Sequence, residues 1–536
     1  MINEAWVINE LRRRGSLVID AYPGFGKSRL AVRVAKGWVE GGGRVLIMTR
    51  SRMEALQLCG FFSELGLRDR VSLFLGREVL CPFNAQSQKQ CLDLRLSGVC
   101  KVKDLRSPLT LNTCDLMDYI KLSVCPYEVN RALAHQLPIV VVTHAFLSNN
   151  ELYLELINIL NEWGRDGVLL IMDEFHNVIP GVETVITLEP RDLARWAHDG
   201  NKLARRLLQR IGEVVAEGEE VVLLRGFDIE ELLEGSEGMS DLALKLLMHH
   251  GDDLCAFTFD GRLVRLRCLS LRPIRDLVNR VSNALFLSAS VSRRFMKILS
   301  LVGLRPGYVD IEEMPRDYAA NLRVFVAGGL KLTLNLRVSK PYVELINDFI
   351  RHFVNTAPPA GGLAVFFPSI EYLSFFVNNH LDPPWGVPVF VLDDSSKSSE
   401  VIDKFREEAR WGRSLLITYA QSPVSEGINF LDNELVGIMI VGFPLPQFSQ
   451  WGSMKARFYS RMGVGGFTTT YLFPAVSLTV QIIGRLLRDL DRNRKVALLL
   501  DERFYKYRRF MPRWLAVSMR SINYRALLKL NPWAGD

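Results

Sequence analysis

The sequence lacks several features that would narrow its class. No apolar run approaches the roughly 20 residues needed to cross a membrane, so we expect no membrane partner. The N-terminal segment has a glutamate at its fourth position and does not resemble a signal peptide. Internal repeats and low-complexity tracts are also absent. These absences predict an intracellular protein, cytoplasmic or, in a eukaryote, nuclear.

The chain is long and moderately basic. Its 536 residues exceed what a single hydrophobic core organises, which predicts three or four domains, and an apolar fraction of 48% indicates a globular protein. A net charge of +7 suits a polyanionic partner such as nucleic acid, although many soluble enzymes are this basic.

The eight cysteines are unevenly distributed, since five of them lie between Cys81 and Cys125. In a reducing compartment such clustering indicates a metal site rather than disulfides. Zinc sites usually pair cysteines two to four residues apart, and this segment has no such pair. The spacing therefore favours a [4Fe–4S] cluster over Zn²⁺, with scattered buried thiols as the alternative.

Apolar runs alternate with helical patterns along most of the chain, which predicts an α/β fold with parallel strands buried on both faces. This alternation is interrupted by two segments, residues 77–130 and 181–275, which are interpreted as insertions. The second segment is helix-like. A break at residues 355–362 precedes a strand of an expected second sheet. The expected strands are Leu17–Asp20, Val45–Thr49, Ile139–Thr143, Val168–Met172, Ala284–Leu287, Leu363–Phe367, Leu415–Thr418, Val436–Val441 and Val496–Leu500.

A glycine-rich turn joins the first expected strand to a helical pattern, as in a phosphate-binding P-loop. Gly24 and Gly26 would let backbone N–H groups face an anion, and the helix N-terminus adds partial positive charge. Lys27 would reach the β- and γ-phosphates of a nucleotide, and Ser28 would ligate Mg²⁺. Ala21 stands where the strict pattern has glycine, and an ordinary glycine-rich turn is the alternative.

Two adjacent carboxylates follow the expected strand Val168–Met172. Asp173 would hold Mg²⁺, directly or through water, and Glu174 would orient or deprotonate the attacking water. His176 would couple this site to whichever parts of the protein move. Acidic residues are common at helix N-termini for structural reasons, which is the alternative.

A third segment, Gln481–Asp489, lies near the C-terminus. Arg485 and Arg488 are three residues apart and share one face of a helix. Guanidinium groups stabilise charge on a transferring phosphoryl group, so both are predicted arginine fingers supplied by the same chain. A basic amphipathic helix is the alternative.

The P-loop, the Asp-Glu-x-His box and Gln-x-x-Gly-Arg-x-x-Arg, in this order, resemble the motifs of superfamily 2 helicases, and Gln481 opens the last of them. The box Asp173–Asn177 is similar to the DEAHN box of the XPD/DinG-type iron–sulfur helicases. The resemblance spans nearly the whole chain. It includes that family's motifs III, IV and V and the segment after motif V, at Ser288–Ser290, Phe366–Ser369, Ser425–Phe430 and Gly442–Pro446.

This resemblance implies two RecA-like parallel-sheet motor domains, with an iron–sulfur domain and a helical Arch-like insertion within the first. The expected boundaries are 1–76, 131–180 and 276–335 for motor domain 1, 77–130 for the iron–sulfur domain, 181–275 for the Arch-like insertion, and 336–536 for motor domain 2.

The resemblance also assigns cofactor ligands. Cys81 and Cys125 match the first and last cluster ligands. We choose Cys100 and Cys114 as the middle two, and Cys91 could replace either. ATP and Mg²⁺ are the other expected cofactors, with Glu426 and Gly427 of motif V also placed at the nucleotide.

Single-stranded and forked DNA are the expected partners. Arg50 resembles a motif Ia phosphate contact, while His144 and Ser369 also follow expected strands; a structural role is the alternative for His144. Further candidates are Trp451 with Lys455 and Arg457, and the segment Arg503–Arg525, for which packing on the second domain is the alternative.

Phe175, Ser290 and Asn429 depart from the family's alanine, threonine and aspartate, and no adenine-recognition motif precedes the P-loop. The resemblance implies an ATP-dependent 5′→3′ DNA helicase that translocates on single strands in DNA repair. The alternatives are a translocase that does not unwind and a weakened DNA-binding scaffold.

Overall fold

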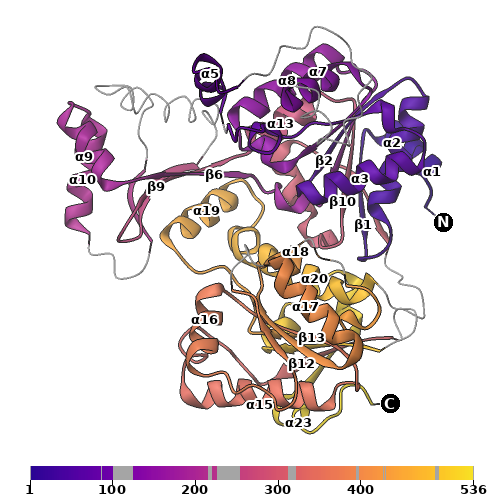
Figure 1. The fold of residues 1–536 in the computed structure, drawn as a ribbon, viewed down its shortest axis with the longest axis vertical. Coiled ribbons are helices and arrows are strands. Elements are labelled where there is room, and N and C mark those ends of the chain that lie inside the picture. Colours follow the sequence, from indigo (N-terminus) through magenta and orange to yellow (C-terminus); the bar gives the residue numbers. More distant parts are fainter. Residues whose placement is uncertain are drawn as a thin grey trace.

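The computed structural model describes residues 2–85, 87–100, 125–214, 220–225, 254–311, 321–393, 398–426, 428, 430–488 and 494–534. Two seven-stranded sheets lie one above the other, and a smaller sheet projects sideways from the upper one (Figure 1).

The first sheet contains seven parallel strands in the order β11-β1-β10-β5-β2-β4-β3. Strands β1 and β5 are buried along their whole length, as is typical where both faces of a parallel sheet are covered. The strands are β1 (Ser16–Ala21), β2 (Arg44–Thr49), β3 (Val71–Leu73), β4 (Ile139–Thr143), β5 (Val168–Asp173), β10 (Asn283–Ser288) and β11 (Gly307–Ile311). The accompanying helices are α1 (Glu4–Arg14), α2 (Lys27–Glu40), α3 (Arg52–Glu64), α4 (Arg77–Leu80), α5 (Gln88–Leu96), α7 (Pro126–Gln136), α8 (Asn150–Trp163) and α13 (Arg272–Asn279).

The strand order places the motifs of the first half side by side. Because the strands are parallel, their carboxyl ends meet at one edge of the sheet. Along that edge come the glycine-rich turn after β1, Ser288–Ser290 after β10, Asp173 and Glu174 after β5, Arg50 after β2 and His144 after β4. Segments distant in sequence therefore form one continuous row.

The second sheet is also parallel, in the order β14-β15-β13-β16-β17-β12-β18. All nine strands expected from apolar runs are present, in these two sheets. The strands are β12 (Leu322–Gly328), β13 (Gly361–Phe367), β14 (Val389–Val391), β15 (Arg413–Tyr419), β16 (Gly437–Val441), β17 (Lys495–Leu500) and β18 (Met519–Asn523). The helices are α15 (Lys340–Thr356), α16 (Ile370–Asn379), α17 (Ser398–Trp411), α18 (Pro423–Glu426), α19 (Gln450–Arg461), α20 (Phe473–Ile483), α21 (Arg503–Lys506), α22 (Arg513–Ser518) and α23 (Tyr524–Leu527).

Strand β12 corrects one detail of the expected boundaries. A division between residues 335 and 336 assigns β12 to the first motor domain, but it pairs with β17 and β18 in the second sheet. Both β12 and β18 were missed as strands.

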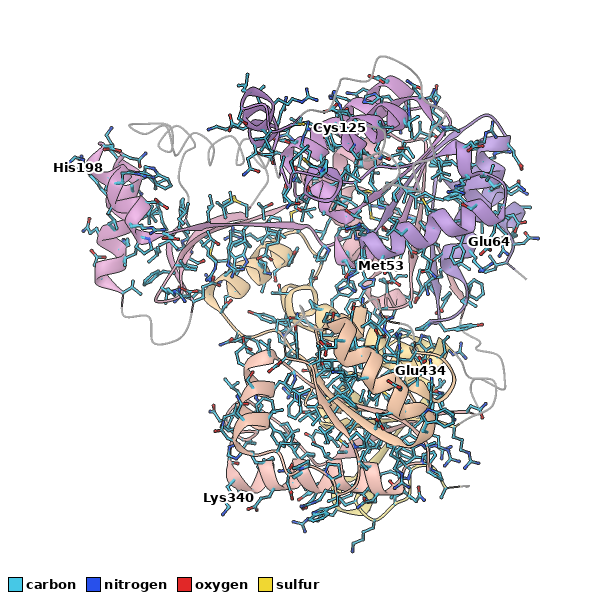
Figure 2. The ribbon with its side chains drawn as sticks, viewed as in Figure 1. Met53, Glu64, Cys125, His198, Lys340 and Glu434 are labelled. Carbon is cyan, nitrogen blue, oxygen red and sulfur yellow. A yellow bond between two sulfur atoms is a disulfide. The ribbon has the colours of Figure 1, made fainter. Side chains whose placement is uncertain are left out.

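The described residues of the insertion between β5 and β10 include strands that were not expected. Its described residues form a four-stranded antiparallel sheet, β6-β9-β8-β7, with two helices, and His198 lies near its outer tip (Figure 2). A disulfide joins Cys255 and Cys268, directly opposite each other on β8 and β9. The elements are β6 (Val182–Leu188), α9 (Pro190–His198), α10 (Lys202–Glu213), β7 (Val221–Arg225), β8 (Leu254–Phe259) and β9 (Val264–Ser270).

One helical segment is as long and apolar as a membrane span, although no apolar run of roughly 20 residues was expected. Thr468–Leu487 combines a π-helical turn, α20 and the 3₁₀ segment η8 (Gly484–Arg488), and by length and composition it could cross a membrane. Its most apolar window is 83% buried inside the protein. Phe473 of this segment packs on Phe295 and His176 of the first half, and a helix buried in this way presents no polar face to solvent.

Candidate nucleotide site and strand-binding groove

The glycine-rich turn has the backbone that a phosphate-binding loop requires. Gly24 and Gly26 both have φ +89°, a conformation that favours glycine, and Gly26 caps the N-terminus of α2. Lys27 is buried, and its Nζ donates to the carbonyl oxygens of Ala21 (3.0 Å) and Tyr22 (3.3 Å). The ammonium group therefore bonds to the turn itself and would exchange these carbonyls for phosphate oxygens.

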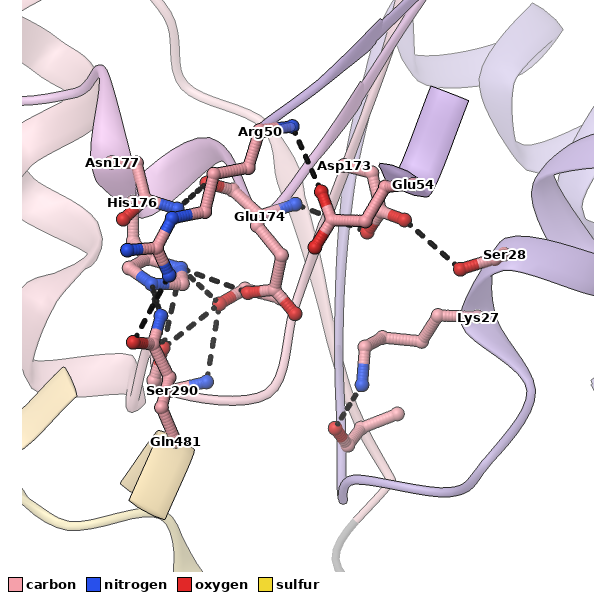
Figure 3. A network of polar contacts seen from close by, with 12 residues as sticks. Lys27, Ser28, Arg50, Glu54, Asp173, Glu174, His176, Asn177, Ser290 and Gln481 are labelled. Carbon is pink, nitrogen blue, oxygen red and sulfur yellow. Dashed lines mark hydrogen bonds and ion pairs between the residues drawn. The ribbon is translucent and has the colours of Figure 1, made fainter. Parts of the chain in front are cut away.

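Ser28 and Asp173 form the pair expected to hold Mg²⁺. Ser28 Oγ donates to Asp173 Oδ2 at 3.1 Å, which joins the start of α2 to the end of β5 (Figure 3). Burial raises the pKa of Asp173 to about 7, together with the nearby charges of Glu174 and Glu54. Asp173 forms no ion pair with a described residue, and a hydroxyl beside a carboxylate fits a hard divalent ion, which binds through few protein ligands and the substrate phosphates.

Glu174 occupies a strained position. Its φ of +48° is uncommon for a residue other than glycine, and such strain concentrates at functional sites. One carboxylate oxygen lies 3.1 Å from His176 Nδ1. Burial alone would raise the pKa of Glu174, but the hydrogen bond from His176 and the charges of Lys27 and Arg50 outweigh burial and lower the pKa to about 2. These interactions favour the ionised form of Glu174, which a group that orients or deprotonates water requires.

Gln481 of the second half connects two sites of the first half. Its Oε1 accepts from Arg50 Nη1 at 3.1 Å, and its Nε2 lies 2.9 Å from His176 Nε2 (Figure 3). Because arginine can only donate, the amide oxygen must face Arg50 and the NH₂ group must face His176. His176 Nε2 then accepts, and the ring proton lies on Nδ1, which is 3.0 Å from Ser288 Oγ and 3.1 Å from the Glu174 carboxylate. The hydrogen bonds run from Arg50 through Gln481 to His176, which lies beside Glu174.

Arg485 lies at the nucleotide cleft but bonds within its own half. Its Nε donates to the Ser425 carbonyl oxygen at 3.1 Å, and its Nη1 donates to that of Ile428 at 3.1 Å. It lines the same cleft as Lys27 and Glu174, with a volume of about 250 Å³. Typical ligand pockets hold roughly 300–1,000 Å³, so a nucleotide requires the halves to separate slightly or Lys27 to move.

The two halves touch at the P-loop itself. A Cβ atom on Gly24 would lie 3.0 Å from the Leu487 carbonyl oxygen, and one on Gly484 would lie 2.7 Å from Pro23 Cγ. The start of η8 thus packs on the glycine-rich turn. The side chains of Arg488 and Glu426, and the whole of Gly427, lie outside the described residues.

A larger groove of about 1,010 Å³ adjoins the nucleotide cleft and contains all three predicted DNA contacts, Arg50, His144 and Ser369. Both ring nitrogens of His144 are buried without a hydrogen-bond partner among the residues that can be described. Burial lowers the pKa of His144 to about 3, with the charges of His176 and Arg50 acting in the same direction. Ser369 Oγ accepts from Tyr372 N at 3.3 Å and caps α16.

Trp451 and Lys455 contact the insertion instead of an open surface. Trp451 Nε1 and Lys455 Nζ donate to the two carboxylate oxygens of Glu183, at 2.7 and 2.8 Å. Arg267 Nη1 lies 3.2 Å from the same carboxylate, and Trp451 is only 3% exposed. The indole of Trp451, a candidate strand contact from the sequence, is therefore bound by Glu183 and buried. Glu183 instead joins α19 to the insertion.

The C-terminal segment mostly supports the packing alternative. Phe504, Trp514 and Leu515 are buried, and β18 adds to the edge of the second sheet. Arg503 is an exception, because it lines the groove.

Cys81 and Cys125 come close together near α7 (Figure 2 labels Cys125). Burial raises the pKa of the Cys125 thiol, and neighbouring Cys81 adds to the effect. Cys91 and Cys100 also carry free thiols, whereas Cys114 lies outside the described residues. Within the described ranges, no three His, Cys, Asp or Glu side chains gather closely enough to hold a metal. Cys81 and Cys125 thus lie near each other, and the assignment of all four cluster ligands remains a prediction.

Three contributors were missed from the sequence: Glu54, Glu183 and Arg337. Glu54 completes a capping box with Ser51 at the start of α3 and lines the nucleotide cleft. The spacing Ser-x-x-Glu could have indicated it. Glu183 and Arg337 had no such local signal.

Residues 350–518 match the helicase C-terminal domain family. The ATP-dependent DNA helicase CHL1 of Vanderwaltozyma polyspora is 28% identical over 186 residues, which cover 30% of this chain and 22% of that protein. CHL1 of Saccharomyces cerevisiae is 26% identical over 227 residues, covering 38% and 26%. The chain thus matches about a quarter of the length of these curated relatives.

The whole chain matches solved structures. An XPD helicase structure superposes with a TM-score of 0.66 at 16% identity, covering 97% of this chain and 98% of that one. The structure of S. tokodaii Xpd4 gives a TM-score of 0.59 at 15% identity, covering 97% and 98%.

Proposed function

We propose that this chain is an ATP-dependent DNA helicase, because its fold is similar to that of an XPD helicase structure and its residues 350–518 match the helicase C-terminal domain family. We further propose that it translocates 5′→3′ on single-stranded DNA, unwinds forked duplexes and serves DNA repair. The observation that carries the proposal is one cleft lined by Lys27, Glu174 and Arg485, from the facing edges of both sheets.

The proposed cycle follows from the positions of these groups. Lys27 and the backbone N–H groups of the turn would hold the triphosphate, with Ser28 and Asp173 on Mg²⁺. Glu174 would accept a proton from the attacking water. Arg485 would leave its backbone carbonyl partners and stabilise charge on the γ-phosphoryl group when the halves close. Hydrolysis would release that contact and let the halves separate.

The chain from Arg50 through Gln481 to Glu174 offers a route by which DNA would affect hydrolysis. A DNA phosphate in the groove would compete with Gln481 Oε1 for the Arg50 guanidinium. Gln481 and His176 would then be free to reorient around the nucleotide. DNA binding and ATP hydrolysis would thus share one set of hydrogen bonds.

Gln481→Ala is expected to reduce the stimulation of ATP hydrolysis by single-stranded DNA about tenfold, while DNA binding persists, because the link between Arg50 and His176 is lost. Steady-state hydrolysis with and without oligonucleotide measures the ratio. Gln209→Ala, on α10 of the insertion, is the matched control. A normal ratio in Gln481→Ala would exclude this route.

Forked duplexes with one single-stranded tail test the whole proposal. We expect ATP-dependent strand separation with a 5′ tail and little with a 3′ tail. DNA-stimulated hydrolysis without separation of either fork would favour a translocase, and DNA binding without stimulated hydrolysis would favour a scaffold.

We also propose that Cys81, Cys100, Cys114 and Cys125 hold a [4Fe–4S] cluster. When bound, it would chiefly stiffen a small domain beside the DNA. Protein purified without oxygen should be brown with broad visible absorbance, lost in Cys125→Ser and kept in Cys91→Ser. A colourless protein with stoichiometric zinc would contradict this assignment.

A further inference from the structure

Two arginines follow adjacent strands of the second sheet and line the groove between the halves. Arg337 lies in the segment after β12, and Arg503 follows β17 at the start of α21. Because β12 and β17 are parallel neighbours, their carboxyl ends bring these segments together. Arg503 Nη2 donates to the carbonyl oxygen of Leu332, five residues before Arg337, at 3.1 Å. The two cations therefore belong to one wall of the groove.

Arg337 is held in place without an acidic partner. Its guanidinium lies over the Tyr372 ring, 4.4 Å from the centroid, and the Tyr372 hydroxyl donates to the Arg337 carbonyl oxygen at 2.7 Å. Its Nε is buried and has no hydrogen-bond partner in the described part of the chain. The Arg337 guanidinium is thus held on an aromatic ring.

Arg503 is fixed by a buried carboxylate. Its Nε and Nη2 donate to Asp501 Oδ1 and Oδ2 at 2.9 and 2.7 Å, and Asp501 is fully buried. Asp501 also accepts from Leu332 N at 3.0 Å. This anchors Arg503 and the segment that leads to Arg337 to the same carboxylate, so the two side chains are held in a common arrangement before any ligand arrives.

The charge near Arg337 is not balanced. Burial lowers the pKa of Arg337 and the charge of Arg503 acts in the same direction, against the opposing effects of Tyr372 and Glu371. Glu371 is exposed and forms no ion pair with Arg337 among the described residues, while Glu183, elsewhere in the groove, is bound by Lys455. Asp501 compensates the charge of Arg503, so Arg337 supplies the uncompensated positive charge on this wall that would attract an anion.

We propose that Arg337 and Arg503 bind one backbone phosphate of a single strand lying in the groove. This inference rests on the proposed function. It places a phosphate contact on the second half of the chain, in addition to the contacts proposed for Arg50 and His144 on the first half. A planar guanidinium on an aromatic ring suits bidentate contact with phosphate oxygens. Such a contact carries no base preference, as expected of a protein that tracks the backbone.

Binding of a fluorescent oligothymidylate, measured by anisotropy across a salt series without nucleotide, tests this site. Arg337→Gln and Arg337→Met both remove the charge, and the methionine stem still covers Tyr372. We expect each to bind about tenfold more weakly. The slope of log affinity against log salt should fall in magnitude by about 0.7, the value for one phosphate contact on a single strand. Arg351→Gln on α15, where Arg351 is paired with Asp348 and Asp382, should behave as wild type.

The slope of log affinity against log salt does not depend on the fraction of active protein. It therefore stays informative if a variant is partly unfolded. Variants that keep the wild-type affinity and slope would overturn this inference while leaving the proposed function intact. A wild-type protein that binds no oligonucleotide would overturn both.

Discussion

Replacing Lys27 with alanine is expected to lower single-strand-stimulated ATP hydrolysis by about 10²–10³-fold, the usual cost of removing one well-placed group that stabilises transition-state charge. Lys27 is buried at the start of α2 and opens onto the cleft that Arg485 and Glu174 also line. Oligonucleotide binding should change little, because Arg50 and the groove lie farther along the sheet edge.

The matched control for this variant is Lys36→Ala. Lys36 lies on the same helix, is partly exposed and is 3.9 Å from Glu40, so its removal should leave hydrolysis unchanged. Melting curves should show that both variants fold. If the Lys27 variant hydrolysed ATP at the wild-type rate, the glycine-rich turn would not be the phosphate site.

Glu174→Gln is expected to lower hydrolysis by about 10²–10⁴-fold while ATP still binds, since the amide keeps the shape of the side chain but cannot accept the proton of the attacking water. The position of Glu174 in the cleft with Lys27 and Arg485, 3.1 Å from His176 Nδ1, is the physical reason for this role. Single-turnover hydrolysis and binding of a fluorescent ATP analogue separate the two steps.

Glu40→Gln, an exposed change at the end of α2, is the control for this second variant. If the Glu174→Gln protein hydrolysed ATP nearly as fast as wild type, Glu174 would not be the catalytic base. Its strained φ and its ion pair would then have a structural role only. Loss of ATP binding together with hydrolysis would point to a damaged cleft rather than a missing base.

The interdomain contacts limit how the halves can move. Glu183 of the insertion is hydrogen-bonded to α19 of the second half. Gln481 of α20 is hydrogen-bonded to Arg50 and His176 of the first half. Any opening of the cleft must break these bonds or carry the insertion along. Partly buried, charge-assisted hydrogen bonds of this kind make a small number of discrete arrangements more favourable than continuous deformation.

Local patterns were sufficient for much of the fold and the nucleotide site. Strands buried on both faces are continuous apolar runs, so they can be recognised locally. The glycine-rich turn and the Asp-Glu pair could be interpreted because each follows such a strand. Parallel topology then brought Lys27, Asp173, Arg50 and His144 to one edge.

Features set by long-range pairing could not be predicted in the same way. The residues of β12 were not recognised as a strand, and the boundary at residue 335 placed them in the wrong half because their pairing with β17 is long-range. Trp451 next to Lys455 has the composition of a strand contact, and only the fold shows that Glu183 binds both. The disulfide between Cys255 and Cys268 depends on the register of β8 and β9. Arg337 carries no motif and becomes informative only beside Tyr372 and Arg503.

The most direct measurement is steady-state ATP hydrolysis by the wild-type protein as single-stranded DNA is added. If the cleft and the groove are coupled through Gln481, the rate should rise by about tenfold or more and saturate as the groove fills. A rate that stays the same with and without DNA, or no hydrolysis at all, would contradict a motor built from these two halves.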